Sequence, residues 1–253
     1  MKKLIVLLGI VIAAISAAQA QEFKLAKTSG RLELYLGRVT VEGHAGNEII
    51  FSSRDRDREE DERAKGLKAI NSLGLDDNTG LGINVADKGA TVEVRQLKKM
   101  NSPEIKILVP KGVIVYFNHE SQYGGEATFR NLENEIEISA QYNNIELENV
   151  TGPLTVKSVY GSVDARFSNT VKGPLSIASI YGHVDVTLPV ATKANLKMTT
   201  SYGEIFMASD FNLEITQKDG MRSWGDKVDG KLNGGGMSID LRADYGKIYL
   251  RKK

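Results

Sequence analysis

Apolar and polar residues alternate in short segments that recur through the second half of the chain, each in the same phase relative to a tyrosine. Three residues after five of these tyrosines come Ile145, Val163, Val184, Ile205 and Ile248, and five residues after come Leu147, Ala165, Val186, Met207 and Leu250. Alternation with a period of two is typical of a strand with one buried face. A second alternating segment precedes each tyrosine, so the pattern predicts two short strands per repeat.

The tyrosines mark a corner between the two strands of each repeat. The dipeptides at these corners are Tyr123-Gly124, Tyr142-Asn143, Tyr160-Gly161, Tyr181-Gly182, Tyr202-Gly203 and Tyr245-Gly246. They recur at intervals of 18 to 21 residues, and the last interval, of 43 residues, is close to twice that length. Glycine and asparagine are the residues that best tolerate a left-handed backbone, so we expect a left-handed residue at each corner.

Two architectures fit two short strands per repeat of about 20 residues. In a β-solenoid each repeat is one coil, and equivalent residues stack about 4.8 Å apart. In an antiparallel sandwich the strands would pair as hairpins, which do not require the same residue type at the same phase. The recurrence favours the solenoid, in which Val163, Val184 and Ile205 would be vertical neighbours.

The N-terminal part of the chain lacks the tyrosine repeat but keeps the alternation. Leu32, Leu34 and Leu36 predict a strand, and further alternating segments follow up to residue 117. A charged run at residues 54–63 precedes apolar residues at helical spacing, Ala64, Leu67, Ile70 and Leu73, which predict one short amphipathic helix. We therefore expect an all-β protein, with an N-terminal β-rich cap carrying one short helix (residues 21–117) and a β-solenoid region continuous with it (residues 118–253).

The first twenty residues have the layout of a secretory signal peptide. Lys2 and Lys3 precede an apolar run from Leu4 to Ile15, and Ala18-Gln19-Ala20 has the small residues that a signal peptidase recognises. About 12 apolar residues are too few to cross a bilayer, which takes roughly 20. We expect cleavage before Gln21, no membrane span after signal cleavage, and an exported chain in the periplasm or at the cell surface.

Charge and cysteine content exclude several classes of function. The chain of 253 residues has 33 Lys and Arg against 32 Asp and Glu, which does not favour binding to nucleic acid. It has no cysteine, which excludes disulfides, thiolate metal sites, a catalytic cysteine and a lipid anchor on cysteine. The three histidines, His44, His119 and His183, lie far apart in sequence and lack metal-binding spacing. We predict no metal, no cofactor and no catalytic residue.

Three acidic residues share one outward position in successive repeats. Glu146, Asp164 and Asp185 each stand four residues after a corner tyrosine, so stacked coils would place them in a column about 5 Å apart. Carboxylates at that spacing can hydrolyse a glycoside or bind calcium. We favour the alternative, a solvated acidic ladder with basic neighbours such as Arg166.

The corner tyrosines have two interpretations as well. Stacked tyrosines can shield the corner, which we favour, or present an aromatic strip to a glycan or protein partner. The candidate ligand surface predicted from the sequence therefore combines both columns: Tyr142, Tyr160, Tyr181, Tyr202, Glu146, Asp164 and Asp185.

The repeats resemble the bacterial family of putative adhesins with β-strand repeats, an exported domain without an assigned function. The resemblance rests on the step Val109-Pro110-Lys111-Gly112-Val113, on corners such as Gly161-Ser162-Val163, and on the closing segment from Leu232 to Ile248. It implies an exported β-helix-like protein without catalytic residues. We thus expect a non-enzymatic interaction module that binds a glycan or an envelope protein. The alternative is a carbohydrate-active enzyme that uses the acidic column.

Overall fold

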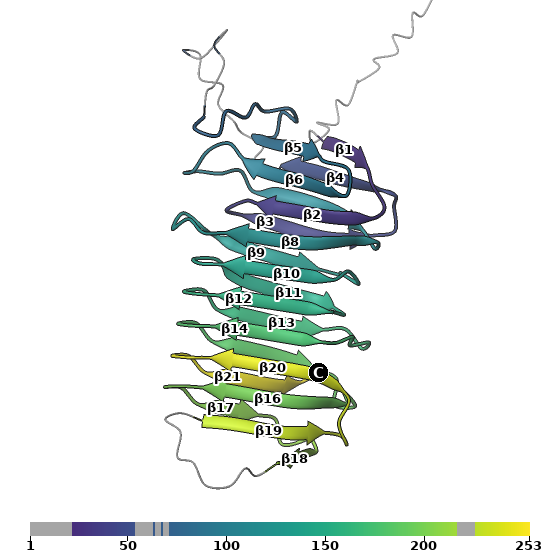
Figure 1. Ribbon diagram of the computed structural model, residues 1–253, viewed down its shortest axis with the longest axis vertical. Coiled ribbons are helices and arrows are strands. Elements are labelled where there is room, and N and C mark those ends of the chain that lie inside the picture. Colours follow the sequence, from purple (N-terminus) through teal and green to yellow (C-terminus); the bar gives the residue numbers. More distant parts are fainter. Residues whose placement is uncertain (1–21, 54–62, 64–66, 68–70, 217–225) are drawn as a thin grey trace, which may run out of the picture.

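The computed structural model describes residues 22–53, 63, 67, 71–216 and 226–253. Over these residues the protein is all-β, and no α-helix is present among them. The strands form two sheets that face each other across an apolar core, and short coils stack into an elongated rod (Figure 1).

The spatial order of the strands along the rod differs from their order in the chain. Sheet A contains, from one end to the other, β1 (Glu22–Ala26), β4 (Glu48–Ser53), β7 (Ile105–Pro110), β3 (Val39–His44), β9 (Glu126–Arg130), β11 (Asn144–Val150), β13 (Val163–Phe167), β15 (Val184–Leu188), β21 (Ile248–Lys252) and β17 (Ile205–Met207). Sheet B contains β18 (Leu213–Ile215), β19 (Asp226–Leu232), β16 (Ala194–Thr200), β20 (Met237–Ala243), β14 (Leu175–Ser179), β12 (Leu154–Ser158), β10 (Ile136–Ala140), β8 (Val113–His119), β2 (Gly30–Tyr35), β6 (Thr91–Gln96) and β5 (Ile83–Asp87).

Successive coils stack in parallel register, as the repeat predicts. In sheet B, Ile136 pairs with Leu154, and Leu154 pairs with Leu175 in the next coil. In sheet A, Ile145 pairs with Val163 in the same way. All of these side chains are buried between the sheets, and the residues between them face outward. Parallel pairing of equivalent residues confirms the solenoid and excludes the hairpin sandwich.

The C-terminal coil lies inside the stack rather than at its end. Strands β20 and β21 pair with β14 and β15 on one side and with β16 and β17 on the other. Val184 therefore pairs with Ile248, and Ile248 pairs with Ile205. The prediction that Val184 and Ile205 are vertical neighbours is wrong, because the last coil separates them. The interval of 43 residues contains β18 and β19, which extend sheet B beyond β16 before the chain returns to fill this position.

The N-terminal coil is inserted in the same way. Strand β2 lies between β6 and β8, and β3 lies between β7 and β9. Antiparallel strands continue the sheets at the two ends of the rod, through β1–β4–β7 and β5–β6 at one end and β16–β19–β18 at the other. The change from parallel to antiparallel pairing ends the regular stack of coils at both ends of the rod.

Two sequence predictions concern segments that lie wholly or partly outside the described residues. The signal peptide at residues 1–20 is one such segment, and Ala64 and Ile70 of the predicted helix belong to the other. Leu67 and Leu73 are described, are not α-helical and are exposed, so the helix is not supported. In the part of the chain that the structure describes, no helix has the length and apolarity needed to cross a membrane. The division into a cap and a repeat region at residue 117 stays a prediction.

The inserted coil predicts which core residues are energetically coupled. Val184→Ala should cost about 1 to 3 kcal/mol of unfolding free energy, because it opens a cavity in the buried column. In double-mutant cycles with Ile248→Val, Val184→Ala should be non-additive, because the two residues are paired neighbours. With Ile205→Val it should be additive within about 0.5 kcal/mol. Urea unfolding of the single and double variants measures both cycles, and coupling of Val184 to Ile205 alone would contradict this strand order.

Candidate interaction surface

Five tyrosine rings stack along one edge of the rod, and we call them the tyrosine ladder. In spatial order they are Tyr142, Tyr160, Tyr181, Tyr245 and Tyr202. Neighbouring ring centroids lie 4.7, 5.1, 5.1 and 4.9 Å apart, and the interplanar angles are between 5° and 17°. Between 41% and 74% of each residue is exposed. The ladder follows the corners where sheet B strands end, such as the turn from β20 to β21 at the left of Figure 1.

Backbone hydrogen bonds between coils fix the spacing of the ladder. The amide of Tyr160 donates to the carbonyl of Gln141 at 2.8 Å, and the amide of Tyr181 donates to the carbonyl of Val159 at 2.8 Å. The amides of Tyr245 and Tyr202 donate in the same way to the preceding coil in space. Because the sheet hydrogen bonding continues through the corner, each ring is held one strand spacing from the next.

The glycines after the tyrosines are required because the neighbouring coil approaches closely, and not because their φ angles are positive. None of Gly161, Gly182, Gly246 and Gly203 has a positive φ, so the predicted left-handed corner is wrong. Instead, a Cβ on any of them would lie within 3.0 Å of a backbone oxygen in the neighbouring coil. The glycines stack on each other, and a side chain at any of them would collide with the coil next to it.

Left-handed residues occupy the opposite corner of the coil. Asn131 and Asn149 both have φ of 53°, and the Nδ2 of Asn149 donates to the Oδ1 of Asn131 at 2.8 Å. Gly152 follows in the same turn with φ of 86°. The return turn therefore carries the backbone conformation that the sequence predicts for the tyrosine corner.

A buried asparagine ends the glycine column. Asn143 is fully buried, and its Nδ2 donates to the carbonyls of Gly37 at 2.8 Å and Gly125 at 3.0 Å. Its Oδ1 lies 2.8 Å from the Nδ1 of buried His119. Because Oδ1 can only accept, His119 carries its proton on Nδ1. One side chain thus links three coils below the first ring of the ladder.

Protonation of His119 should weaken the fold at acidic pH. Its Nε2 is buried and has no hydrogen-bond partner among the described residues, and burial lowers the pKa of His119 below its ordinary value, against the opposing effect of the bond to Asn143. Below about pH 6.5 the unfolded chain therefore binds a proton that the folded chain does not, and the free energy of unfolding falls by at most about 1.4 kcal/mol per pH unit. Urea unfolding across this range measures the effect.

The control for this prediction is a second histidine. His119→Gln should remove the step in the pH dependence, and the same change at the half-buried surface residue His183 should leave it in place. An unchanged step in His119→Gln would assign it to another group.

The structure places Glu146, Asp164 and Asp185 opposite one another on β11, β13 and β15. Each carboxylate is paired with a base. Glu146 lies 3.5 Å from the Nη1 of Arg166, Asp164 lies 3.3 Å from the Nε2 of His183, and Asp185 lies 2.9 Å from the Nε of Arg251.

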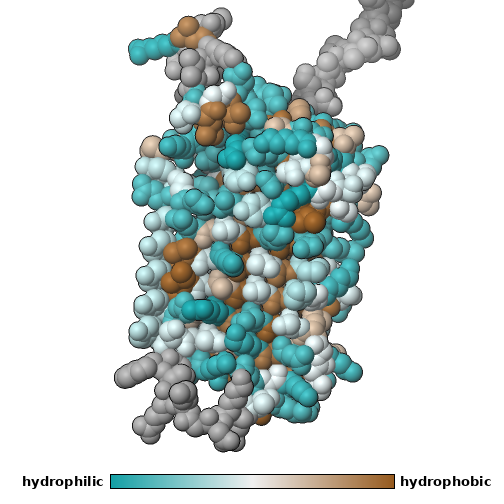
Figure 2. All heavy atoms as spheres, in the orientation of Figure 1, coloured by the Kyte–Doolittle hydropathy of each residue, from teal (hydrophilic) through white to brown (hydrophobic). Residues whose placement is uncertain are grey.

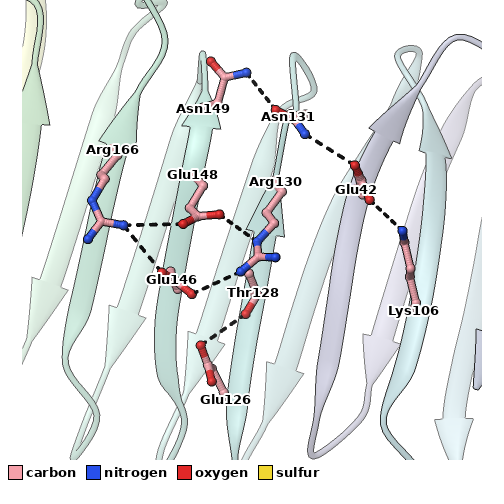
Figure 3. Close-up of polar contacts among 10 residues, drawn as sticks. All are labelled: Glu42, Lys106, Glu126, Thr128, Arg130, Asn131, Glu146, Glu148, Asn149 and Arg166. Atoms are coloured by element: carbon pink, nitrogen blue, oxygen red, sulfur yellow. Dashed lines mark hydrogen bonds and ion pairs between the residues drawn. The ribbon is translucent and has the colours of Figure 1, made fainter. Parts of the chain in front are cut away.

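Arginines from the next outward column complete this network. Figure 3 shows Arg130 and Arg166 on either side of Glu146 and Glu148, with the Nε of Arg130 at 2.7 Å from Glu148. The acids and bases alternate across neighbouring strands, so arginines neutralise Glu146, Glu148 and Asp185, while Asp164 contacts the imidazole of His183. Such exposed pairs contribute about 0 to 1 kcal/mol each. This geometry does not favour the enzyme alternative.

Aromatic residues continue the acidic column beyond Asp185, on β21 and β17. Tyr249 follows Asp185 in register, and Phe206 follows Tyr249 with ring centroids 5.4 Å apart.

Among the described residues, no three His, Asp or Glu side chains are grouped to hold a metal ion. Figure 2 shows hydrophilic side chains over most of one face, with hydrophobic residues in small separate patches.

The structure brings the predicted tyrosines together and adds one that sequence reasoning left out. Tyr245 lies between Tyr181 and Tyr202 in the ladder. The dipeptide Tyr245-Gly246 marks it as a corner tyrosine in the sequence, but its distance of 43 residues from Tyr202 suggested a position two repeats away. The predicted acidic residues lie on the outer face of sheet A and form a separate column from the ladder.

Residues 130–233 match the Toastrack DUF4097 family, which confirms the resemblance for this part of the chain. The chain is also similar to two solved structures. One is a putative cell adhesion protein from Clostridium sporogenes ATCC 15579, with 15% identity, a TM-score of 0.45, and coverage of 93% of this chain and 100% of that chain. The other is a putative adhesin from Bacteroides fragilis NCTC 9343, with 13% identity, a TM-score of 0.38, and coverage of 92% and 96%. No curated protein matches the chain.

Proposed function

We propose that this chain, which carries a Toastrack DUF4097 domain at residues 130–233, is an exported, non-enzymatic interaction module. Its partner is a glycan or a protein of the cell envelope, and the tyrosine ladder is its binding surface. Export rests on the signal-peptide layout of residues 1–20. A mature protein whose N-terminus is Gln21, established by mass spectrometry of the secreted chain, would support it, and an uncleaved intracellular chain would contradict it.

The exposure of the ladder is the observation that carries this proposal. Five tyrosines remain 41% to 74% exposed although the fold buries its repeated aliphatic columns between the sheets. Tyrosine combines an apolar ring with a polar hydroxyl, and it is enriched where proteins contact partners. The rings are also held rigidly by the stacked corners, so binding to them costs little conformational entropy. The carboxylates of Glu146, Asp164 and Asp185 on sheet A already contact arginine or histidine side chains.

A binding screen with ladder variants tests the proposal. The chain of residues 21–253 is screened on a glycan array and against purified envelope proteins, together with a variant in which Tyr160, Tyr181 and Tyr245 are replaced by Ala. We expect the variant to lose the binding that the unchanged chain shows.

The matched control is Tyr123→Ala. Tyr123 is an exposed corner tyrosine, and among the described residues no ring stacks on it. Thermal melting of both variants verifies that they are folded. Equal binding by the triple variant and the unchanged chain would reject the ladder as the interaction surface.

A further inference from the structure

The tyrosine ladder presents the edges of its rings to solvent. Tyr160, Tyr181 and Tyr245 each have a neighbouring ring on both faces at 4.7 to 5.1 Å. A ligand can therefore stack on a face only at the two end rings, Tyr142 and Tyr202. Along the rest of the ladder it meets ring edges and hydroxyl groups. Within the described part of the chain, none of these hydroxyl groups has a hydrogen-bond partner, so all of them are available to a ligand.

A second row of polar groups runs beside the ladder, two residues after each tyrosine. It consists of Asn144, Ser162, His183, Lys247 and Glu204 in spatial order. The two charged members pair with each other at 2.8 Å. This row thus offers donors and acceptors with its two opposite charges paired, and it suits an uncharged ligand with many hydroxyl groups.

The spacing of the rings favours a glycan over a peptide. In an extended peptide along the rod, residues on one side recur about every 6.6 Å, so they would fall out of step with rings 4.7 to 5.1 Å apart within a few residues. A pyranose linked through equatorial oxygens on opposite sides of its ring advances by close to one strand spacing. Successive sugars in such a chain are turned over, but both edges of each sugar carry hydroxyl groups, so one sugar can meet each tyrosine over the whole ladder.

We propose that the ladder binds a linear, uncharged, β-linked glycan that lies parallel to the rod, with one sugar unit at each tyrosine hydroxyl. This inference rests on the proposed function and specifies its ligand. The matching repeat makes two predictions that a nonspecific aromatic patch does not: binding depends on glycan length, and it depends on the hydroxyl groups rather than on the rings.

The first test measures affinity against length by calorimetry. The unchanged chain of residues 21–253 is titrated with β-1,4-linked glucose and N-acetylglucosamine oligosaccharides of increasing length, from the disaccharide upward. Affinity should rise with each added unit until the glycan spans the five rings, and then level off. α-1,6-linked glucose oligosaccharides, whose repeat differs, should bind weakly at every length. Equal affinity for both linkages, or no dependence on length, would overturn the inference.

The second test removes hydroxyl groups and keeps the rings. The double variant Tyr181→Phe, Tyr245→Phe should bind the longest β-1,4-linked oligosaccharide about tenfold or more weakly, since each lost hydrogen bond is worth roughly a factor of three to ten. Its melting temperature should stay close to that of the unchanged chain, because stacking is retained. Tyr123→Phe is the matched control and should bind normally. Undiminished binding by the double variant would overturn the role of the hydroxyls.

The outcomes separate this inference from the broader function. If an envelope protein binds through the ladder and no β-linked oligosaccharide does, the glycan inference is overturned and the proposed function stands. If the triple alanine variant retains every interaction of the unchanged chain, both are overturned.

Discussion

Removal of residues 237–253 should prevent the chain from folding cooperatively. These residues form β20 and β21, which lie between β14–β15 and β16–β17 and contribute the buried Ile239, Leu241, Ile248 and Leu250. Full burial of one such side chain is worth about 1.5 to 3 kcal/mol. The four together approach the whole stability of a typical domain, about 5 to 15 kcal/mol. We expect circular dichroism to show no sharp thermal transition in the truncated chain.

A peptide added in trans provides the control for this truncation. A synthetic peptide of residues 236–253 should restore a cooperative transition, because the vacated position is flanked by strands that would hydrogen-bond to it on both sides. The same peptide with Ile248→Asp should not, since it would bury an unpaired charge. If the truncated chain alone melted as sharply as the full chain, the last coil would have to lie at the end of the rod, in chain order.

The sequence predicts the strand periodicity well because stacking is a local, repeated requirement. Residues such as Val163 and Val184 stand at the same phase of their repeats, and they are paired neighbours in sheet A. The order of the coils is a different kind of information. Nothing in the alternation around Ile248 distinguishes an end position from an inserted one, because a buried strand with two neighbours requires the same residues in either place. Only the interval of 43 residues pointed to an irregularity.

The glycine after each corner tyrosine was identified correctly from the sequence, but the reason predicted for it was wrong. Glycine after tyrosine is compatible with either a left-handed backbone or a close approach of two chains. Sequence alone does not separate these causes, since both exclude a side chain. The approach to the next coil depends on the distance between stacked backbones. At the corner that lacks glycine, Asn143 has an ordinary φ and its amide donates to the carbonyls of Gly37 and Gly125, which only the structure shows.

The sequence predicted a column of stacked tyrosines but missed one of its five members. Repeated Tyr-Gly corners predict stacked rings once the solenoid is accepted, and four members were identified from chain order. Tyr245 completes the ladder because its coil is inserted, so this omission has the same cause as the misplaced Ile205. The pairing of the acidic column with Arg130, Arg166 and Arg251 follows from register between neighbouring strands. The sequence indicated such neighbours only in general terms.

Gly182→Ala should lower the free energy of unfolding by about 3 kcal/mol or more, at the upper end of what overpacking costs in a tight interior. The added Cβ would lie within 3.0 Å of the carbonyl oxygen of Gly161 and of the amide nitrogen of Ser162. These atoms cannot withdraw without disturbing the hydrogen bond from Tyr181 to Val159 in the same corner. The melting temperature should fall by about 10 °C on the usual scale of 2 to 4 °C per kcal/mol.

Replacement by asparagine separates close approach from backbone conformation. Asparagine tolerates a left-handed φ, so Gly182→Asn would be nearly harmless if conformation were the reason for glycine. Because the reason is the approach of the neighbouring coil, we expect Gly182→Asn to be at least as destabilising as Gly182→Ala. Gly234 is the matched control. It has φ of 82° with no atom within 4 Å of a built Cβ, and Gly234→Asn should cost less than about 1 kcal/mol. A well-tolerated Gly182→Asn in urea unfolding would restore the left-handed corner and remove the steric explanation for the glycine column.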